Sequence, residues 1–491
     1  MEKVWLKSYQ AGVPAEIDIS RYASLNQIFH ETCDKFYNCP SYVNMGKVYT
    51  FSELKEKVTQ FSSFLQNTLK LKKGDRLAIM MPNLLQYPIA MWGALQAGLA
   101  IVNVNPLYTP RELEHQLVDS GAKAIIIVAN FATTLEKVIS NTLVKHIIVT
   151  EIGDCLPFLK RTLVNFVVKY IKKMVPAFKF KHYYGFNQAI LLGTKLPFKE
   201  VLVSPEDVAY LQYTGGTTGV AKSAILLHAN MLANLEQAYV WLKPDIKEAT
   251  EIIITALPMY HIFSLTANCL AFFRVGGLNV LITNPRDIKS FIKELKKYPF
   301  TAITGVNTLF NALLRQPEFN EVDFSHLKIA LGGGMPVQRA VALRWKEVTG
   351  RPLLEAYGLT EACPAVCINP LNLKEYNGSI GLPISSTEVS IQDDEGRELS
   401  FNEPGELCVK GPQVMKGYWQ RPEETATALK GGWLHTGDIA TIDEEGFVRI
   451  VDRKKGKTIR CQGKDMIHGQ SCNNDFCCFL YIGFKPDIGL F

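Results

Sequence analysis

The feature that most constrains the fold is an alternation of apolar strands with amphipathic helices, which begins near Leu54. The segment "FSELKEKVTQFSSFLQNTL" carries apolar residues at helical spacing, and the strand-like "RLAIMMPN" follows it. A helix "YPIAMWGALQAG", a strand "LAIVNVNP", a helix "RELEHQLVDSG" and a strand "AKAIIIVAN" continue the series, with Gly98 and Gly121 at the helix ends. This alternation predicts right-handed crossover units and a parallel sheet.

The same alternation of helices and strands returns after residue 220, from "ANMLANLEQAYVWL" and "EIIITALP" to "FTAITGV". From about residue 375 the sequence is rich in Gly and Pro and contains short alternating strands, which is typical of a small antiparallel unit. We therefore predict an α/β fold with two doubly wound, mostly parallel sheets plus a small antiparallel β unit. The expected segments are an N-terminal α/β subdomain (1–200), a second α/β subdomain (201–374), a small β-barrel-like subdomain (375–452), and a hinge with an aberrant tail (453–491).

Composition excludes several classes of protein. The chain has 491 residues, of which 47% are hydrophobic and 20% charged, an ordinary globular balance. The net charge of +6 is small for this length, so we expect no nucleic-acid partner. No secretory signal and no membrane-spanning apolar run is visible, and the 11 cysteines are mostly scattered singly. We expect a cytoplasmic protein with reduced thiols.

A Gly- and Thr-rich loop, "YTGGTTGVAK", follows the strand-like "VAYLQY". Glycines let backbone N–H groups converge on phosphate oxygens, and hydroxyls and a lysine add donors. The loop fits neither the P-loop of NTPases nor the dinucleotide-binding glycine pattern. It predicts a phosphate-binding loop; the alternative is a surface turn between a strand and a helix that begins near His228.

Other motifs follow predicted strands or lie in turns, where parallel sheets collect ligands. "LEAYGLTEACP" offers an aromatic ring at Tyr357, a hydroxyl at Thr360 and a carboxylate at Glu361. "LGGGMP" could let a flat base lie on backbone, "LPMYHIF" supplies His261, and "HTGD" supplies Asp438, which suits ribose hydroxyls. His261 or Asp438 alone would more often be structural, but together these motifs favour a nucleotide site.

In their order, "YTGGTTGVAK", "LGGG", "YGLTE", "WLHTGD" and "VDRKK" resemble the motifs of the adenylate-forming superfamily. Within it, the chain is similar to bacterial long-chain fatty-acid–CoA ligases, from its N-terminus to about Lys455. The resemblance implies two half-reactions. A fatty carboxylate attacks the α-phosphate of ATP to give acyl-AMP and pyrophosphate, and the thiol of coenzyme A then displaces AMP. Magnesium and fixed donors would relieve the charge repulsion.

The resemblance also implies roles for individual residues. His261 would lie beside the substrate carboxylate, Thr360 would contact the α-phosphate, and Glu361 would hold Mg²⁺. Lys455 matches the family's hinge. The β- and γ-phosphates would be held by Thr214, Gly215, Gly216, Thr217, Thr218, Gly219 and Lys222, and the adenosine by Gly332, Gly333, Gly334, Tyr357, Asp438 and Arg453.

The chain departs from the family pattern at three places. One is Leu265, which stands where some relatives have a gating aromatic residue near the acyl tunnel, so we do not assume gating. Ser223 stands where the family usually has Gly, which we expect to be tolerated in a helical residue. After "VDRKK" the sequence no longer resembles the family, so we expect a truncated C-terminal α/β domain and a poorly ordered tail. Its four cysteines fit no usual zinc spacing; a disrupted reading frame or a truncated product is the preferred reading. The alternatives to a working ligase are an impaired remnant that binds only ATP and fatty acid, and a ligase for another carboxylic acid.

The stretch 156–182 is basic and apolar, with seven Lys or Arg and no acidic residue. Val164, Val167, Val168 and Ile171 form a helical stripe with lysines beside it. This pattern is typical of an interfacial helix on an anionic membrane, which would place the protein peripherally on the inner face. A solvated helix over the core fits the pattern equally well. The sequence does not reveal the oligomeric state.

Overall fold

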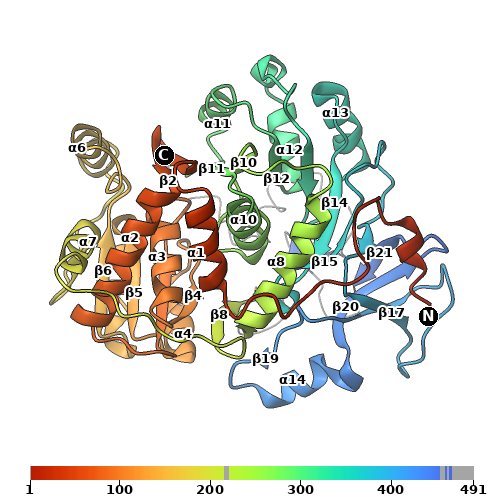
Figure 1. The fold of residues 1–491 in the computed structure, drawn as a ribbon, viewed down its shortest axis with the longest axis horizontal. Coiled ribbons are helices and arrows are strands. Elements are labelled where there is room, and N and C mark those ends of the chain that lie inside the picture. The colour runs from red at the N-terminus through yellow and green to blue at the C-terminus, as the bar shows by residue number, and fades with distance from the viewer. Residues whose placement is uncertain (1, 215–220, 454–458, 462–463, 467–491) are drawn as a thin grey trace.

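The computed structural model describes residues 2–214, 221–453, 459–461 and 464–466 (Figure 1). One large sheet has eight strands, in the spatial order β19 (Gly417–Tyr418), β9 (Ser223–Leu227), β8 (Val208–Tyr213), β4 (Ala100–Asn103), β3 (Arg76–Met80), β5 (Ala124–Val128), β6 (His146–Thr150) and β7 (Tyr184–Gly185). Strands β8, β4, β3, β5, β6 and β7 are paired in parallel.

The other large sheet has nine strands, in the order β16 (Leu382–Pro383), β15 (Ala365–Ile368), β14 (Leu354–Gly358), β13 (Ile329–Gly332), β12 (Ala302–Gly305), β10 (Ile252–Thr255), β11 (Leu278–Leu281), β1 (Pro40–Asn44) and β2 (Lys47–Thr50). Its central pairs are parallel and its edges antiparallel. The prediction of two mostly parallel sheets is confirmed.

The sheets exchange strands across the segment boundaries expected at residues 200 and 374. Strands β1 and β2 precede residue 200 but belong to the nine-stranded sheet, whereas β8 and β9 follow it and belong to the eight-stranded sheet. Strand β19 lies beyond residue 374 and pairs with β9. The boundaries expected at residues 200 and 374 therefore do not coincide with the division of the strands between the two large sheets.

Alternate residues of the strands separate the core into layers. In β3, Leu77 and Ile79 belong to one apolar cluster, whereas Ala78 and Met80 belong to another. This is the period-2 pattern of a strand that is buried on both faces. The largest cluster also unites both large sheets with helices α1 (Leu25–Lys35), α2 (Phe51–Ser63), α3 (Gln86–Gln96), α7 (Phe186–Gly193), α8 (His228–Leu242) and α10 (Ala271–Arg274).

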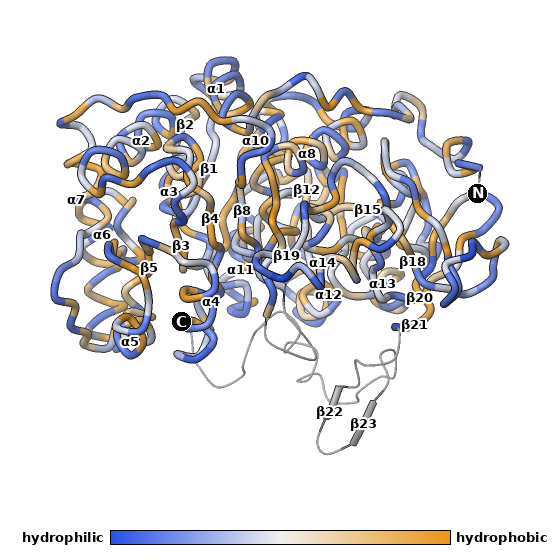
Figure 2. Tube along the Cα trace, turned by 90° about the horizontal axis from the view of Figure 1, so that it is seen from below, coloured by the Kyte–Doolittle hydropathy of each residue, from blue (hydrophilic) through white to orange (hydrophobic). Residues whose placement is uncertain are grey.

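The opposite faces of the sheets carry separate clusters. In Figure 2, α1, α2, α3, α8 and α10 lie on one side of the strands, and a second set of helices lies on the other. This second set comprises α4 (Pro110–Ser120), α5 (Ala132–Glu136), α11 (Ile288–Leu295), α12 (Asn307–Leu314) and α13 (Arg339–Thr349).

A small antiparallel sheet lies at the other end of the molecule from α6 (Phe158–Phe166), which sits at the periphery (Figure 1). Its strands are β17 (Glu388–Gln392), β18 (Gly405–Lys410), β20 (Leu434–Ile442) and β21 (Val448–Arg453), next to helix α14 (Pro422–Ala428). The predicted antiparallel unit is thus confirmed. Two further strands, β22 (Ile459–Cys461) and β23 (Lys464–Met466), pair with each other.

In the described part of the chain, no helix is both long and apolar enough to cross a bilayer. The seven cysteines whose side chains are described are all free thiols. The expectation of a poorly ordered tail falls mainly on residues outside those that the structure describes, and so does the hinge position Lys455.

Candidate active site

A cavity of about 800 Å³ opens where the three larger sheets meet. Ten of the residues singled out in the sequence line it: Thr214, Lys222, His261, Gly333, Gly334, Tyr357, Thr360, Glu361, Asp438 and Arg453. Gly332 lies just before this group, at the end of β13. Gly215, Gly216, Thr217, Thr218 and Gly219 lie outside the described residues.

The Gly/Thr loop connects β8 to β9, so it closes a hairpin. At its base the Thr214 N–H donates to the Lys222 carbonyl over 2.8 Å, and the Thr214 hydroxyl donates to the same oxygen over 3.3 Å. Ser223 is buried and begins β9, so the condition under which the serine was expected to be tolerated, a helical residue, is not met. A strand, rather than the helix α8, follows the loop because Ser223 to Leu227 pair along β8.

The turn after β14 carries Thr360 and Glu361 into the same cavity. It folds back tightly at Gly358, where an added Cβ would lie 2.1 Å from the Pro364 carbonyl oxygen. A side chain cannot fit at that distance, so the close return requires glycine. One Glu361 carboxylate oxygen accepts a 2.6 Å hydrogen bond from the Tyr418 hydroxyl.

Asp438 is buried and is held through both carboxylate oxygens. The Tyr357 hydroxyl donates to Oδ2 over 2.6 Å, and Arg453 Nε donates to Oδ1 over 2.5 Å. Burial, and next the Asp438 charge, raise the pKa of Tyr357 well above its ordinary value, so this hydroxyl keeps its proton. Two donors therefore hold the carboxylate at the cavity wall.

His261 follows β10 and is exposed to the cavity, with protein on its other sides. Desolvation by that surrounding protein lowers its pKa to about 4, so the ring is neutral near pH 7. Its Nδ1 accepts a 3.3 Å hydrogen bond from the Phe263 N–H. This contact favours the tautomer that carries its proton on Nε2, which can donate a hydrogen bond.

The glycines after β13 allow close packing at the cavity wall. A Cβ on Gly333 would lie 3.0 Å from the Phe263 ring and 3.1 Å from the Ala356 carbonyl. Gly334 has φ +74°, a left-handed conformation that favours glycine. The exposed backbone of this turn faces the same cavity as Tyr357.

The rest of the cavity is apolar. Its lining comes from α8, α10 and the nine-stranded sheet: Ala238, Trp241, Leu242, Ile253, Ala271, Phe272, Ala302 and Ile329. Trp241 is fully buried and its indole N–H donates to the Asn369 carbonyl over 3.3 Å. The cavity therefore has a polar end, lined by residues such as Lys222, Glu361 and Asp438, and an apolar end within the core.

Sequence reasoning missed several residues of the polar end, chiefly Tyr418, Arg421 and Glu424. Tyr418 also lies under Lys222, with the ammonium nitrogen 5.4 Å from the ring centroid. The available signal was an aromatic residue beside Gly417 in "MKGYWQRP", but its strand β19 is only two residues long. Pairing with β9, far away in sequence, is what brings Tyr418 to the site.

Comparison with known proteins decides the family. The family model described as "AMP-binding enzyme" matches residues 29–419. The chain belongs to the AMP-binding enzyme family. A long-chain-fatty-acid–CoA ligase of Escherichia coli O157:H7 is 59% identical over 455 residues, which are 93% of this chain and 81% of that protein. The predicted resemblance to the long-chain fatty-acid–CoA ligases among the AMP-binding enzymes is confirmed.

Solved structures share the architecture. A long-chain-fatty-acid–CoA ligase from Archaeoglobus fulgidus matches with TM-score 0.76 and 25% identity, covering 91% of this chain and 87% of that one. An anthranilate CoA ligase in complex with anthranoyl-AMP matches with TM-score 0.79 and 20% identity, covering 92% of this chain and 82% of that one. The second likeness is one of fold alone.

Proposed function

We propose that this AMP-binding enzyme joins a long-chain fatty acid to coenzyme A through an acyl-adenylate, at the expense of ATP. The observation that carries the proposal is that one cavity joins a polar end, suited to a nucleotide, to an apolar end. An acyl-adenylate has the same two parts. The 59% identity to a ligase of that name supports the choice of acid.

At the polar end, Thr214, Lys222 and the glycines and threonines between them would hold the β- and γ-phosphates of ATP. The Thr360 hydroxyl would donate to the α-phosphate. The adenine would lie between Tyr357 and the Gly332–Gly334 turn. Asp438 would accept hydrogen bonds from the ribose hydroxyls, since each of its oxygens has a second lone pair beyond the bond to Tyr357 or Arg453.

Glu361 is the residue that would hold Mg²⁺. A carboxylate lining a polar cavity, next to the Thr360 hydroxyl, supplies the hard oxygen donors that this ion prefers. When bound, Mg²⁺ would neutralise phosphate charge and so lower the repulsion between ATP and an approaching carboxylate. Tyr418 would orient Glu361 by donating to one carboxylate oxygen.

The fatty carboxylate would lie beside His261, with its chain in the apolar end. A neutral imidazole donates one hydrogen bond without forming an ion pair, so the carboxylate stays nucleophilic toward the α-phosphate. Burial of the chain would contribute ~0.8 kcal/mol per CH₂. The donors of the polar end would then stabilise the charge that develops on the α-phosphate.

The purified protein tests the proposal in two assays. Palmitate should support ATP–pyrophosphate exchange and formation of palmitoyl-CoA, whereas benzoate and free amino acids should not. Exchange with benzoate or an amino acid but not palmitate would indicate a ligase for another acid. Calorimetric binding of ATP and palmitate without exchange would contradict the proposed catalysis and indicate a binding protein.

We also propose that α6 and the turn after it bind an anionic membrane surface, which would place the enzyme peripherally on the cytoplasmic side. Val168 is buried and Val164 is partly buried, so part of the stripe expected from the sequence faces the core. Another stripe faces outward, and its side chains are 52–81% exposed: Leu159, Leu163, Phe166 and Tyr170. Lysines and arginines flank it, as in interfacial helices.

Vesicle co-sedimentation tests this surface. Changing Leu159, Leu163 and Phe166 to Ser should weaken binding to anionic vesicles at least ten-fold, because each apolar contact contributes ~0.8 kcal/mol per buried CH₂. The matched control is Leu343→Ser on α13, which removes a leucine that is 48% exposed on another helix. Equal binding by both variants would overturn the proposal.

A further inference from the structure

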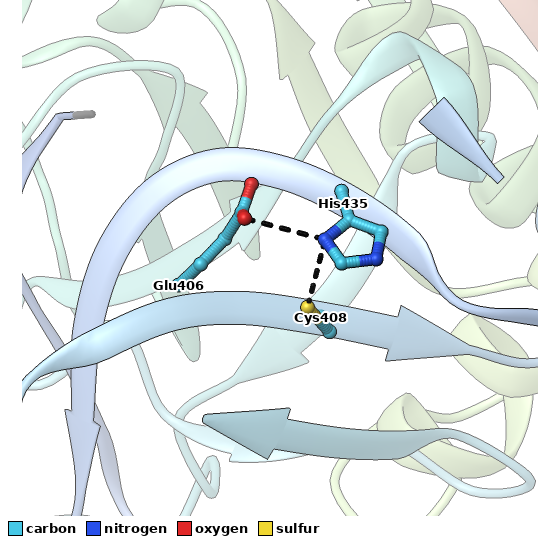
Figure 3. Close-up of side chains that lie close together, drawn as sticks. All are labelled: Glu406, Cys408 and His435. Atoms are coloured by element: carbon cyan, nitrogen blue, oxygen red, sulfur yellow. Dashed lines mark hydrogen bonds and ion pairs between the residues drawn. The ribbon is translucent and has the colours of Figure 1, made fainter. Parts of the chain in front are cut away.

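Three side chains with metal-binding atoms converge in the small antiparallel sheet (Figure 3). Glu406 and Cys408 are two residues apart on β18, so their side chains share one face of the strand. His435 lies directly opposite Cys408 on β20. The strand register, rather than any spacing in sequence, brings the group together.

Two of the three pairs of ligand atoms lie at separations typical of a metal site. Cys408 Sγ is 3.4 Å from His435 Nδ1, which is 3.2 Å from Glu406 Oε2, and all three groups lie within 4.8 Å. At a tetrahedral zinc ion, bonds of about 2.0–2.3 Å place neighbouring ligand atoms about 3.3–3.6 Å apart. Among the described residues, no other group of three or more such side chains comes this close.

Hydrogen bonds among the three side chains explain their convergence less well than a bound cation does. One imidazole nitrogen, Nδ1, contacts both the thiol and the carboxylate, and it carries at most one hydrogen. A single ion at the centre would bond to all three atoms. Two of the three side chains are enclosed: Cys408 is fully buried and Glu406 is 8% exposed, whereas His435 is partly exposed. A divalent cation would compensate the two negative charges of a buried thiolate and carboxylate.

We propose that Glu406, Cys408 and His435 bind a Zn²⁺-class divalent cation, distinct from the magnesium expected at Glu361. Sulfur and imidazole ligands favour zinc over Mg²⁺ or Ca²⁺, which prefer oxygen. On binding, the Cys408 thiol releases its proton to solvent as the sulfur–metal bond forms. The three protein ligands leave a fourth position for water.

The site contacts the part of β20 that carries Asp438. Glu406 Oε1 accepts a 3.0 Å hydrogen bond from the Gly437 N–H, and the Thr436 hydroxyl donates to the Leu407 carbonyl over 2.8 Å. Coordination through Oε2 leaves the Oε1 bond in place. A bound cation would therefore tie β18 to β20 beside the nucleotide residue Asp438, as a structural brace.

Titration with Co²⁺, a spectroscopic substitute for Zn²⁺, tests the proposal. The protein used is the full chain with the tail cysteines Cys461, Cys472, Cys477 and Cys478 changed to Ser, so that they cannot bind the probe. About one equivalent of Co²⁺ should give a thiolate-to-cobalt charge-transfer absorption, which Zn²⁺ should displace. Zn²⁺ should also raise the melting temperature.

Variants in the same background assign the ligands. Cys408→Ser should abolish the absorption, and Glu406→Gln and His435→Asn should weaken Co²⁺ binding ~10-fold or more. His435 is partly exposed, so that variant does not open the core. Cys33→Ser, at another fully buried cysteine, should leave binding unchanged. The proposal is overturned if the folded protein shows no absorption, or if His435→Asn binds Co²⁺ as the parent does.

Discussion

At its polar end the cavity is lined by turns and strand residues from three sheets, whereas at its apolar end it is lined by the sides of helices and strands. Lys222 comes from the eight-stranded sheet, Glu361 from the nine-stranded sheet and Asp438 from the small antiparallel sheet. The apolar end is built mainly from α8, α10 and the nine-stranded sheet.

This difference separates two kinds of requirement. The polar end needs particular atoms at particular places, so one changed group removes an interaction that no neighbour can replace. The apolar end needs only volume and apolar surface, so its residues are interchangeable within limits of size. Substitutions at the two ends should therefore affect different steps of the reaction.

The largest effect is expected at Glu361. Glu361→Gln keeps the shape and the hydrogen bond from Tyr418 but removes the charge that would hold Mg²⁺. Pyrophosphate exchange with palmitate should fall ~10²–10³-fold, as for loss of a transition-state charge contact. Binding of palmitate, measured by calorimetry, should stay unchanged. An unchanged exchange rate would remove Glu361 from the proposed site.

Filling the apolar end should have the next largest effect. Ala271→Phe would displace part of a long chain, and losing about three buried CH₂ groups at ~0.8 kcal/mol each costs ~50-fold in kcat/KM for palmitate. Octanoate should be much less affected, since its chain is shorter. The ratio between the two acids in one variant cancels any loss of folded protein. An equal fall for both acids would contradict the assignment of this end to the acyl chain.

The buried carboxyl group of Glu355, on β14, should make the free energy of unfolding depend on pH. Burial raises its pKa from the ordinary 4.5 to about 7, so the folded state holds its proton more tightly than the unfolded state does. Its stabilising contribution is therefore present below about pH 4.5 and is lost as the pH rises through about 7. For the parent protein, we expect a loss of about 2 kcal/mol in unfolding free energy between about pH 5.5 and 8.5.

Glu355→Gln should remove most of that pH dependence. A glutamine side chain can still accept from the Val337 N–H, which donates to Glu355 over 2.8 Å. Denaturant unfolding at several pH values measures the difference. The interpretation fails if the variant and the parent lose the same stability across this range.

The smallest effects are expected where Asp438 meets its partners. Asp438→Asn should raise the KM for ATP ~10-fold, because the amide cannot accept hydrogen bonds on both sides. Tyr357→Phe removes only the hydroxyl that orients Asp438 and should raise it ~3-fold. Neither change should alter the KM for palmitate. A larger effect from Tyr357→Phe than from Asp438→Asn would show that the aspartate is not the ribose-binding group.

The motif residues of the polar end could be found from the sequence because the chemistry restricts their types. Glycines, hydroxyls and carboxylates after strands mark such a site without any knowledge of packing. Tyr418 and Cys408 could not be found in this way, since each depends on the register of strands distant in sequence. Helix α6 has two apolar stripes, and periodicity alone does not say which one faces the core.

The sequence alone determined the alternation of strands and helices, the antiparallel unit after residue 375, and the residue types available for nucleotide chemistry. These are local properties, because strand and helix periods and turn residues act over a few positions. Only the tertiary structure decided that β1 and β2 join one sheet while β8 and β9 join the other. It also placed Thr214 and Lys222 in one cavity with residues 357–361. Such pairings depend on long-range packing, and the hydrophobic pattern of a strand is compatible with more than one partner.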